Sequence, residues 1–200
     1  MKTEERIQYI IDWIKQYCNS IKYQPVTLVI GVSGGVDSAV TSTLSAKTGL
    51  KTIAVSIPIK QNHEQHELSI KHLEWLKSNF NNVCTKVISL DNVFSSFKET
   101  MYDFKNNLAF ANSRSRLRMV TLYQIAQSNN GLVIGTGNKV EDFGVGFYTK
   151  YGDGGVDISP IADLTKTEVW ELGKELNILE DIINAQPTDG LWDDGRTDIG

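Results

Sequence analysis

Residues 26–38 read VTLVIGVSGGVDS. The first five are apolar or β-branched, as in a buried strand of a parallel sheet, and small residues with three glycines follow them. Small residues after such a strand let backbone N–H groups face one concavity, and a helix that begins there points its positive end at the same place. The stretch therefore predicts an anion-binding loop between a strand and a helix.

Strand-like and helical segments alternate on either side of this loop. Strands are expected at residues 26–30, 52–57, 83–88 and 132–134, and helices at 37–47, 64–78, 92–106 and 112–128. This order predicts an α/β fold with a doubly wound, Rossmann-like parallel sheet and helices on both faces. Sheets of this kind bind ligands at the carboxyl ends of their strands.

The two ends of the chain read as helical. Thr3 is the expected cap of a first helix, and its apolar face is predicted to comprise Ile7, Ile10, Ile11, Ile14 and Tyr17. Thr165 is the expected cap of a helix that continues to about residue 176, and a short helix follows near Glu180. Between these parts, residues 144–160 predict a loop with too many polar anchors to be a simple linker.

Composition narrows the range of partners. A chain of 200 residues with 40% hydrophobic residues can bury one core, so residues 1–200 are expected to form one domain. The net charge of −4, with both signs interspersed, does not favour a nucleic-acid or membrane surface. Small molecules are the expected ligands, and the absence of a signal sequence predicts a cytoplasmic protein with Cys18 and Cys84 reduced in its core.

The residue pattern of the loop indicates which anion it binds. A Walker loop has Lys at the position of Asp37, and a dinucleotide fingerprint needs a glycine pattern that residues 31–36 lack. The later Gly135-Thr136-Gly137 also fails, because Val140 stands where the third glycine belongs. What remains, SGGVDS at residues 33–38, matches the pyrophosphate loop of the N-type ATP pyrophosphatases, which cleave ATP between the α and β phosphates. The alternative, a glycine-rich turn that only closes a βα unit, leaves Asp37 unexplained, since a carboxylate that faces phosphate needs a metal ion between them.

Within that superfamily, the chain resembles the ammonia-dependent NAD synthetases from its first helix to its end. The matching segments are NSRSRLRM (112–119), GTGNKVE (135–141), FYTKYGDGGVD (147–157), LTK (164–166) and PTDGLW (187–192). The resemblance implies a ligase that amidates deamido-NAD with ammonia, through an acyl-adenylate, and releases AMP and pyrophosphate in the final step of NAD biosynthesis. It also implies a homodimer with ATP as co-substrate and Mg²⁺ as cofactor.

The resemblance assigns roles to particular residues. It implies ATP-binding positions at Gly31, Val32, Ser33, Gly34, Gly35, Val36, Asp37, Ser38, Thr136, Lys166 and Thr188. It implies a Mg²⁺ pair of Asp37 and Glu141, charge stabilisation by Lys166 and Asp37 without a protein nucleophile, and deamido-NAD contacts from Arg116, Lys150 and Asp157. Asp37 is expected in solvent-facing polar surroundings, so that its loss spares the fold.

Each of these residues also has a structural interpretation. Arg114, Arg116 and Arg118 could form a solvated helix face, although their spacing puts Arg114 and Arg118 on one side and Arg116 elsewhere. Lys150 could be ordinary surface charge, and Glu141 a dipole-stabilising acid at a helix start. His63 and His66 have no third ligand nearby and are expected on the surface, whereas Trp192 is expected near the site.

Other enzymes and binding proteins share parts of this pattern. A GMP synthetase-type ATP pyrophosphatase has the same loop, but the TKYGDGG segment (149–155) favours NAD synthetases. A non-catalytic adenine-nucleotide sensor would have no use for Asp37, Glu141 and Lys166 together. Only 30 residues precede Gly31, so the expected nitrogen source is free ammonia or ammonia from a separate protein. The family continues beyond this length to a terminal His-Lys pair, so the chain is expected to lack that segment.

Overall fold

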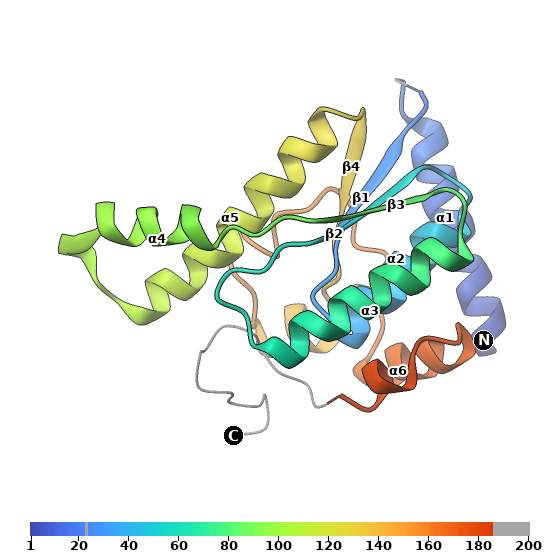
Figure 1. Ribbon diagram of the computed structural model, residues 1–200. Helices are drawn as coiled ribbons and strands as arrows, with labels where there is room; N and C mark the ends of the chain where they lie inside the picture. Colours follow the sequence, from blue (N-terminus) through green and yellow to red (C-terminus); the bar gives the residue numbers. More distant parts are fainter. Residues whose placement is uncertain (23, 186–200) are drawn as a thin grey trace.

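The strands form one parallel sheet in a computed structural model that describes residues 1–22 and 24–185 (Figure 1). The strands are β1 (Thr27–Gly31), β2 (Thr52–Ser56), β3 (Val83–Val87) and β4 (Gly131–Ile134). Their order in the sheet is β3-β2-β1-β4, and Ile158 adds a parallel bridge to Ile134 at the edge. The chain runs outward from β1 to β3 and then returns to the other side of β1. The carboxyl ends of β1 and β4 therefore flank the topological switch point, where such sheets bind ligands.

Helices cover both faces of the sheet, which confirms the predicted doubly wound fold (Figure 1). The helices are α1 (Thr3–Ser20), α2 (Val36–Lys47), α3 (His63–Asn79), α4 (Asp91–Thr100), α5 (Asn107–Gln127), α6 (Lys166–Glu175) and α7 (Glu180–Ile183), with the 3-10 helix η1 (Tyr102–Phe104) and the π-helix η2 (Val140–Val145). Figure 1 shows α5 on one face, with α1, α2, α3 and α6 on the opposite face and α4 projecting beyond the sheet. Within the described residues, no helix is long and apolar enough to cross a membrane.

Alternation along the strands divides the apolar side chains into two cores. Leu28 and Ile30 of β1 point to the core shared by α1, α2, α3 and α6, whereas Val29 points to the smaller core beneath α5. All three side chains are fully buried, as expected for the central strand of a parallel sheet. The strand that carries the phosphate loop is thus fixed from both sides.

The boundary between α4 and α5 differs from the sequence prediction. Residues 92–106 were expected to form one helix and residues 112–128 the next, but α4 ends at Thr100 and α5 begins at Asn107. The reason is local, because the Asn106 side chain accepts a hydrogen bond from Ala109 N at 2.9 Å and caps α5 five residues earlier than predicted.

Three smaller expectations at single residues are wrong. Lys2, and not Thr3, is the N-cap of α1, and Cys18 takes the buried position on this helix while Tyr17 is exposed. Cys84 is exposed because β3 is an edge strand whose outward face is open. In contrast, Thr165 caps α6 as predicted, and Glu168 completes a capping box by accepting from Thr165 N at 2.8 Å.

Candidate active site

A cleft of about 760 Å³ opens at the carboxyl ends of β1 and β4. The eight residues of the predicted phosphate loop line it, together with Thr136, Glu141 and Lys166. Another part of its wall is apolar and is formed by Ile57, Leu68, Met119 and Leu122. A cleft with a polar end at a helix N-terminus and an apolar wall suits a nucleotide, with its phosphates at one end and its base at the other.

Serine hydroxyls shape the phosphate loop. Ser38 Oγ donates to Gly35 O at 2.9 Å and accepts from Ser33 N at 3.2 Å, while Gly35 N donates to Ser33 Oγ at 3.3 Å. Gln61, from the segment before α3, donates through Nε2 to Ser33 O at 2.9 Å. These bonds bend the chain between β1 and α2 so that the loop faces the cleft.

Gly34 is the position in the loop at which only glycine fits. Its φ of +98° lies outside the range that side-chain-bearing residues adopt readily. A Cβ there would lie 2.3 Å from the carbonyl oxygen of Gln65 in α3. At Gly35, by comparison, the nearest atom to an added Cβ is Ser33 Oγ at 3.6 Å. The close approach of α3 therefore explains the first glycine of the pair but not the second.

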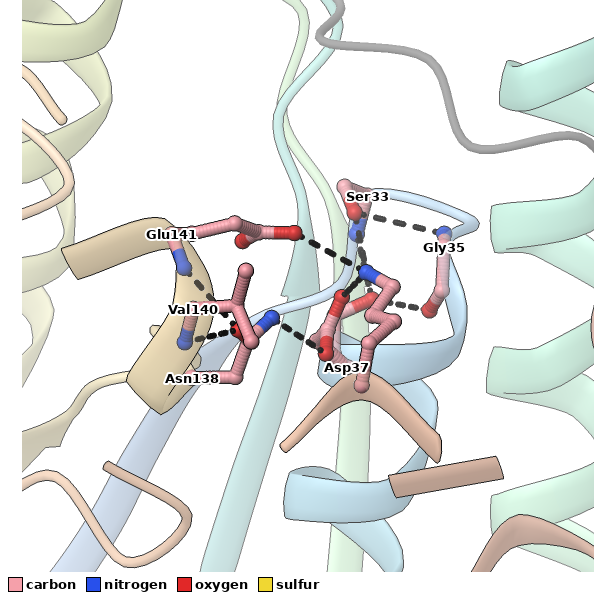
Figure 2. A network of polar contacts seen from close by, with 8 residues as sticks. Ser33, Gly35, Asp37, Asn138, Val140 and Glu141 are labelled. Carbon is pink, nitrogen blue, oxygen red and sulfur yellow. Dashed lines mark hydrogen bonds and ion pairs between the residues drawn. The ribbon is translucent and has the colours of Figure 1, made fainter. Parts of the chain in front are cut away.

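Lys166 joins the two predicted metal-binding carboxylates. Its Nζ donates to Asp37 Oδ2 at 2.5 Å and to Glu141 Oε1 at 2.9 Å. Figure 2 shows Asp37 and Glu141 on opposite sides of this contact, one from the start of α2 and the other from η2. Lys166 is the first residue of α6, where a cation opposes the helix dipole, so its position is better explained by the carboxylates than by helix stability.

Burial and neighbouring charges together determine the protonation states of Lys166 and Asp37. Burial alone would lower the pKa of Lys166, but Asp37 and Glu141 more than offset it and raise that pKa. The Asp37 side chain lines the cleft among polar groups, as predicted, but it is only 16% exposed and is therefore more buried than expected. Its burial raises the pKa of Asp37, and Lys166 opposes that rise. Lys166 therefore remains charged at neutral pH, beside two carboxylates that need a cation.

Asn138 links the Asp37 carboxylate to the backbone of Glu141 (Figure 2). It follows Gly137 at the end of the segment after β4 and is fully buried. Its Nδ2 donates to Asp37 Oδ1 at 3.1 Å. Its Oδ1 accepts from Val140 N at 3.0 Å and from Glu141 N at 3.1 Å. The start of α2 and the start of η2 are thus tied through one side chain.

The pair of carboxylates fits a magnesium ion that also binds substrate. Asp37 and Glu141 both reach one nitrogen atom, so their oxygens are near enough to share one cation. Among residues 1–22 and 24–185, no group of three or more His, Cys, Asp or Glu side chains could hold a metal by itself. Mg²⁺ is commonly held by one or two carboxylates and by substrate phosphates, which matches this set of donors.

The residues predicted to bind deamido-NAD lie outside the lining of this cleft. Arg116 is exposed on α5 and donates through Nε to Lys150 O at 3.2 Å, so these two predicted residues are neighbours. Asp157 accepts from Tyr123 OH at 3.1 Å and from Val133 N at 2.8 Å, next to β4 and α5. The predicted contacts to the two substrates are therefore divided between the cleft and the α5 side of the molecule.

The loop that carries Lys150 is firmly attached to α5. Asp153 Oδ1 accepts from Ser115 Oγ at 2.7 Å and from Thr149 N at 3.0 Å, and Thr149 Oγ1 contacts Asn112 Oδ1 at 2.7 Å. Gly152 packs so closely on α5 that an added Cβ would lie 2.3 Å from Ser115 Oγ. The polar residues of this loop are anchors, as predicted, and two of the sequence motifs meet here.

Sequence reasoning missed several residues of the site. Arg118 lines the cleft and donates through Nε to Ile57 O at 3.0 Å; burial and Arg114 lower its pKa to about 10. Asp142 also lines the cleft. Its burial, and to a smaller extent repulsion from Asp153, raises the pKa of its carboxyl group to about 6. Arg114 is buried and Arg116 is exposed, so the two lie on different sides of α5 as predicted, and Arg114 is not part of a solvated helix face. Thr188 and Trp192 lie outside the described residues.

Comparisons with known proteins agree with this geometry. The NAD synthase family model matches residues 6–199. An NH(3)-dependent NAD(+) synthetase from Carboxydothermus hydrogenoformans is 40% identical over 98% of this chain and 79% of its own length.

Solved structures give the same result. An NMN synthetase from Francisella tularensis has a TM-score of 0.90 and 36% identity, over 99% of this chain and 80% of its own. An NH3-dependent NAD synthetase from Campylobacter jejuni has a TM-score of 0.81 and 30% identity, over 92% and 77% of the two chains. The family match covers nearly the whole chain, and the phosphate loop lies in the cleft of the sheet. The chain therefore belongs to the NAD synthase family, whose members are ligases that form a C–N bond in the final step of NAD biosynthesis.

Proposed function

We propose that this chain amidates deamido-NAD to NAD, with ammonia as the nitrogen source and ATP as the activating substrate. The observation that carries this proposal is the meeting of Asp37, Glu141 and Lys166 beside a pyrophosphate-type loop. A γ-phosphate transferase would have a lysine within the loop, whereas here the cation comes from α6 and reaches the loop from the side.

The first step needs charge stabilisation and not a protein nucleophile. A carboxylate oxygen of the nicotinate ring attacks the α-phosphorus of ATP, and the bond to the bridging oxygen of pyrophosphate breaks. The loop residues 33–38 and the start of α2 would hold the leaving pyrophosphate, and Lys166 would neutralise its growing charge. Asp37 and Glu141 would hold Mg²⁺, which supplies Lewis-acid charge stabilisation when bound.

The second step needs position and the exclusion of water. Ammonia attacks the carbonyl carbon of the acyl-adenylate, the C–O bond to AMP breaks, and ammonia loses a proton as the amide forms. Residues 149–155, which are anchored to α5 and contribute to the lining of the cleft, would form the wall beside the reacting carbon. Arg116, Lys150 and Asp157 would hold the acceptor, and Thr136 and Thr188 would contact ATP.

A second acceptor is favoured by one specific observation. The similar structure from Francisella tularensis is an NMN synthetase, with a TM-score of 0.90. The corresponding acceptor for this chain would be nicotinic acid mononucleotide, which has the same reacting carboxylate as deamido-NAD and lacks the second nucleotide. The chemistry in the cleft would be unchanged, and only contacts on the α5 side would differ.

The remaining features of the proposal come from the family and from composition. A homodimer is proposed, and the exposed apolar side chains Leu108 and Val120 of α5 would suit a subunit contact. Use of free ammonia, a cytoplasmic location, and the absence of nucleic-acid and membrane partners stay predictions of the sequence.

Substrate competition tests the proposal. The protein would be supplied with ATP, Mg²⁺, ammonium and equal amounts of deamido-NAD and nicotinic acid mononucleotide, and all products would be separated by chromatography. We expect NAD, AMP and pyrophosphate in equal amounts. A predominance of NMN would favour the second acceptor, and formation of ADP and phosphate would contradict both.

A further inference from the structure

Asn138 makes one more hydrogen bond than the start of η2 requires, and that bond goes to the Asp37 carboxylate. It is fully buried, and its Oδ1 accepts from Val140 N and Glu141 N at 3.0 and 3.1 Å, which satisfies the first two N–H groups of η2. Its Nδ2 additionally donates to Asp37 Oδ1 at 3.1 Å, across to the first turn of α2. This third bond joins residues that are 101 positions apart in the sequence.

The partners leave one orientation for the Asn138 amide. Backbone N–H groups can only donate, so the atom facing Val140 and Glu141 must be the oxygen. The Asp37 carboxylate accepts, so the atom facing it must be the nitrogen. The amide thus offers its oxygen as an acceptor to one element and its nitrogen as a donor to the other.

We propose that Asn138 is a positioning residue that sets the separation of Asp37 and Glu141, so that both carboxylates bind the same divalent cation. Its oxygen fixes the backbone of Glu141, and its nitrogen holds the Asp37 carboxylate on the opposite side. Lys166 holds the other oxygen of Asp37 and one oxygen of Glu141, so it cannot by itself fix how far apart the two backbones lie. This inference rests on the proposed role of Asp37 and Glu141 in binding metal.

Substitution by serine separates positioning from capping. Serine is about as good an N-cap as asparagine, so N138S retains an acceptor for the start of η2. It is too short to reach Asp37 and adds no charge. The matched control is N106S, because Asn106 caps α5 through Ala109 N, is exposed and does not line the cleft.

Manganese binding is the direct measurement. Wild type, N138S and N106S would be titrated with MnCl₂ in the presence of pyrophosphate, and their thermal unfolding recorded. We expect N138S to bind Mn²⁺ at least about tenfold more weakly, because partners that orient metal ligands typically contribute 10- to 100-fold in affinity. N106S should bind Mn²⁺ like wild type.

A double-mutant cycle gives a second test. If Asn138 acts through Asp37, N138S should weaken Mn²⁺ binding much less in a D37N background than in wild type. Wild-type Mn²⁺ affinity in N138S, or equal losses in both backgrounds, would overturn the inference.

The variant N138T, which fills more of the buried space, replaces N138S if N138S does not fold. Failure of both variants to fold would overturn the inference in favour of a role in stability. Absence of Mn²⁺ binding in wild type would instead count against the proposed function.

Discussion

Asp37 is held by two side chains, Lys166 through one oxygen and Asn138 through the other. If Asp37 holds Mg²⁺ as we propose, D37N should lower kcat/KM for ATP by about 100-fold or more, because the substituted amide removes that ligand and leaves Lys166 with one carboxylate. Because Lys166 keeps Glu141 as a charged partner, the variant should also lose roughly 1.5–3 kcal/mol of unfolding free energy, the usual contribution of a hydrogen bond to a charged group. Initial-rate kinetics and urea unfolding measure the two effects.

The control for D37N is D12N, which changes an exposed carboxylate on α1 that accepts a hydrogen bond from Gln8 Nε2 at 3.0 Å. It should change neither kinetics nor stability beyond about 0.5 kcal/mol. A fully active D37N would show that this carboxylate has a structural role alone.

Arg116 is exposed and bonded to the Lys150 carbonyl, away from the cleft lining. If it holds the acceptor, R116M should raise KM for deamido-NAD by about tenfold and leave KM for ATP unchanged. K86M, an exposed lysine change on β3, serves as the control. Equal rises in both KM values would place Arg116 in a general structural role instead.

At the scale of elements, the close contact between the phosphate loop and α3 gives substitutions at the two adjacent glycines different expected effects on stability. G34A should lose about 3 kcal/mol of unfolding free energy, because a Cβ at a φ of +98° would lie 2.3 Å from Gln65 O. G35A should lose less than about 1 kcal/mol, since the nearest atom is 3.6 Å away, but should raise KM for ATP by narrowing the cradle. Urea unfolding of both variants is the measurement, and similar losses would contradict this account.

Helices α2 and α3 are also joined by a buried histidine. His72 Nε2 lies 2.9 Å from Ser42 Oγ, both residues are fully buried, and burial lowers the pKa of His72 from 6.5 to about 4. As the pH falls below 6.5, the unfolded chain takes up this proton first. Stability should therefore decline between pH 6.5 and about 4, by roughly 3 kcal/mol in total.

The variant H72Q, which does not titrate, tests the source of this decline. It should lose correspondingly less stability than wild type over the same interval in urea unfolding. Identical pH dependence in the two proteins would assign the effect to other groups.

Secondary structure could be predicted from the sequence wherever the signals were local and strong. The run before Gly31 and the Thr165 cap gave β1 and α6 nearly to the residue. The start of α5 was missed, although Asn106 three residues before Ala109 was a readable cap signal. The exposed Cys84 was missed for another reason, because edge position depends on strand order and not on the residues of β3.

At the scale of the whole molecule, the tertiary fold creates the site from distant segments. Asp37 and Lys166 are 129 positions apart, and neither charge pattern nor periodicity near them indicates that they meet. The resemblance to NAD synthetases supplied these residues, but it could not supply Asn138, whose role depends on three hydrogen bonds across two elements. Buried polar connections of this kind are visible only once the sheet is assembled.

Isotope transfer tests most directly the central claim, that the acceptor carboxylate attacks the α-phosphorus of ATP. Deamido-NAD labelled with ¹⁸O in its carboxylate would be turned over with ATP, Mg²⁺ and ammonium, and the products analysed by mass spectrometry. We expect one ¹⁸O atom in the phosphoryl group of AMP and none in pyrophosphate, because the carboxylate oxygen that attacked phosphorus leaves with AMP when ammonia attacks the carbonyl carbon. Label in pyrophosphate or inorganic phosphate would contradict it.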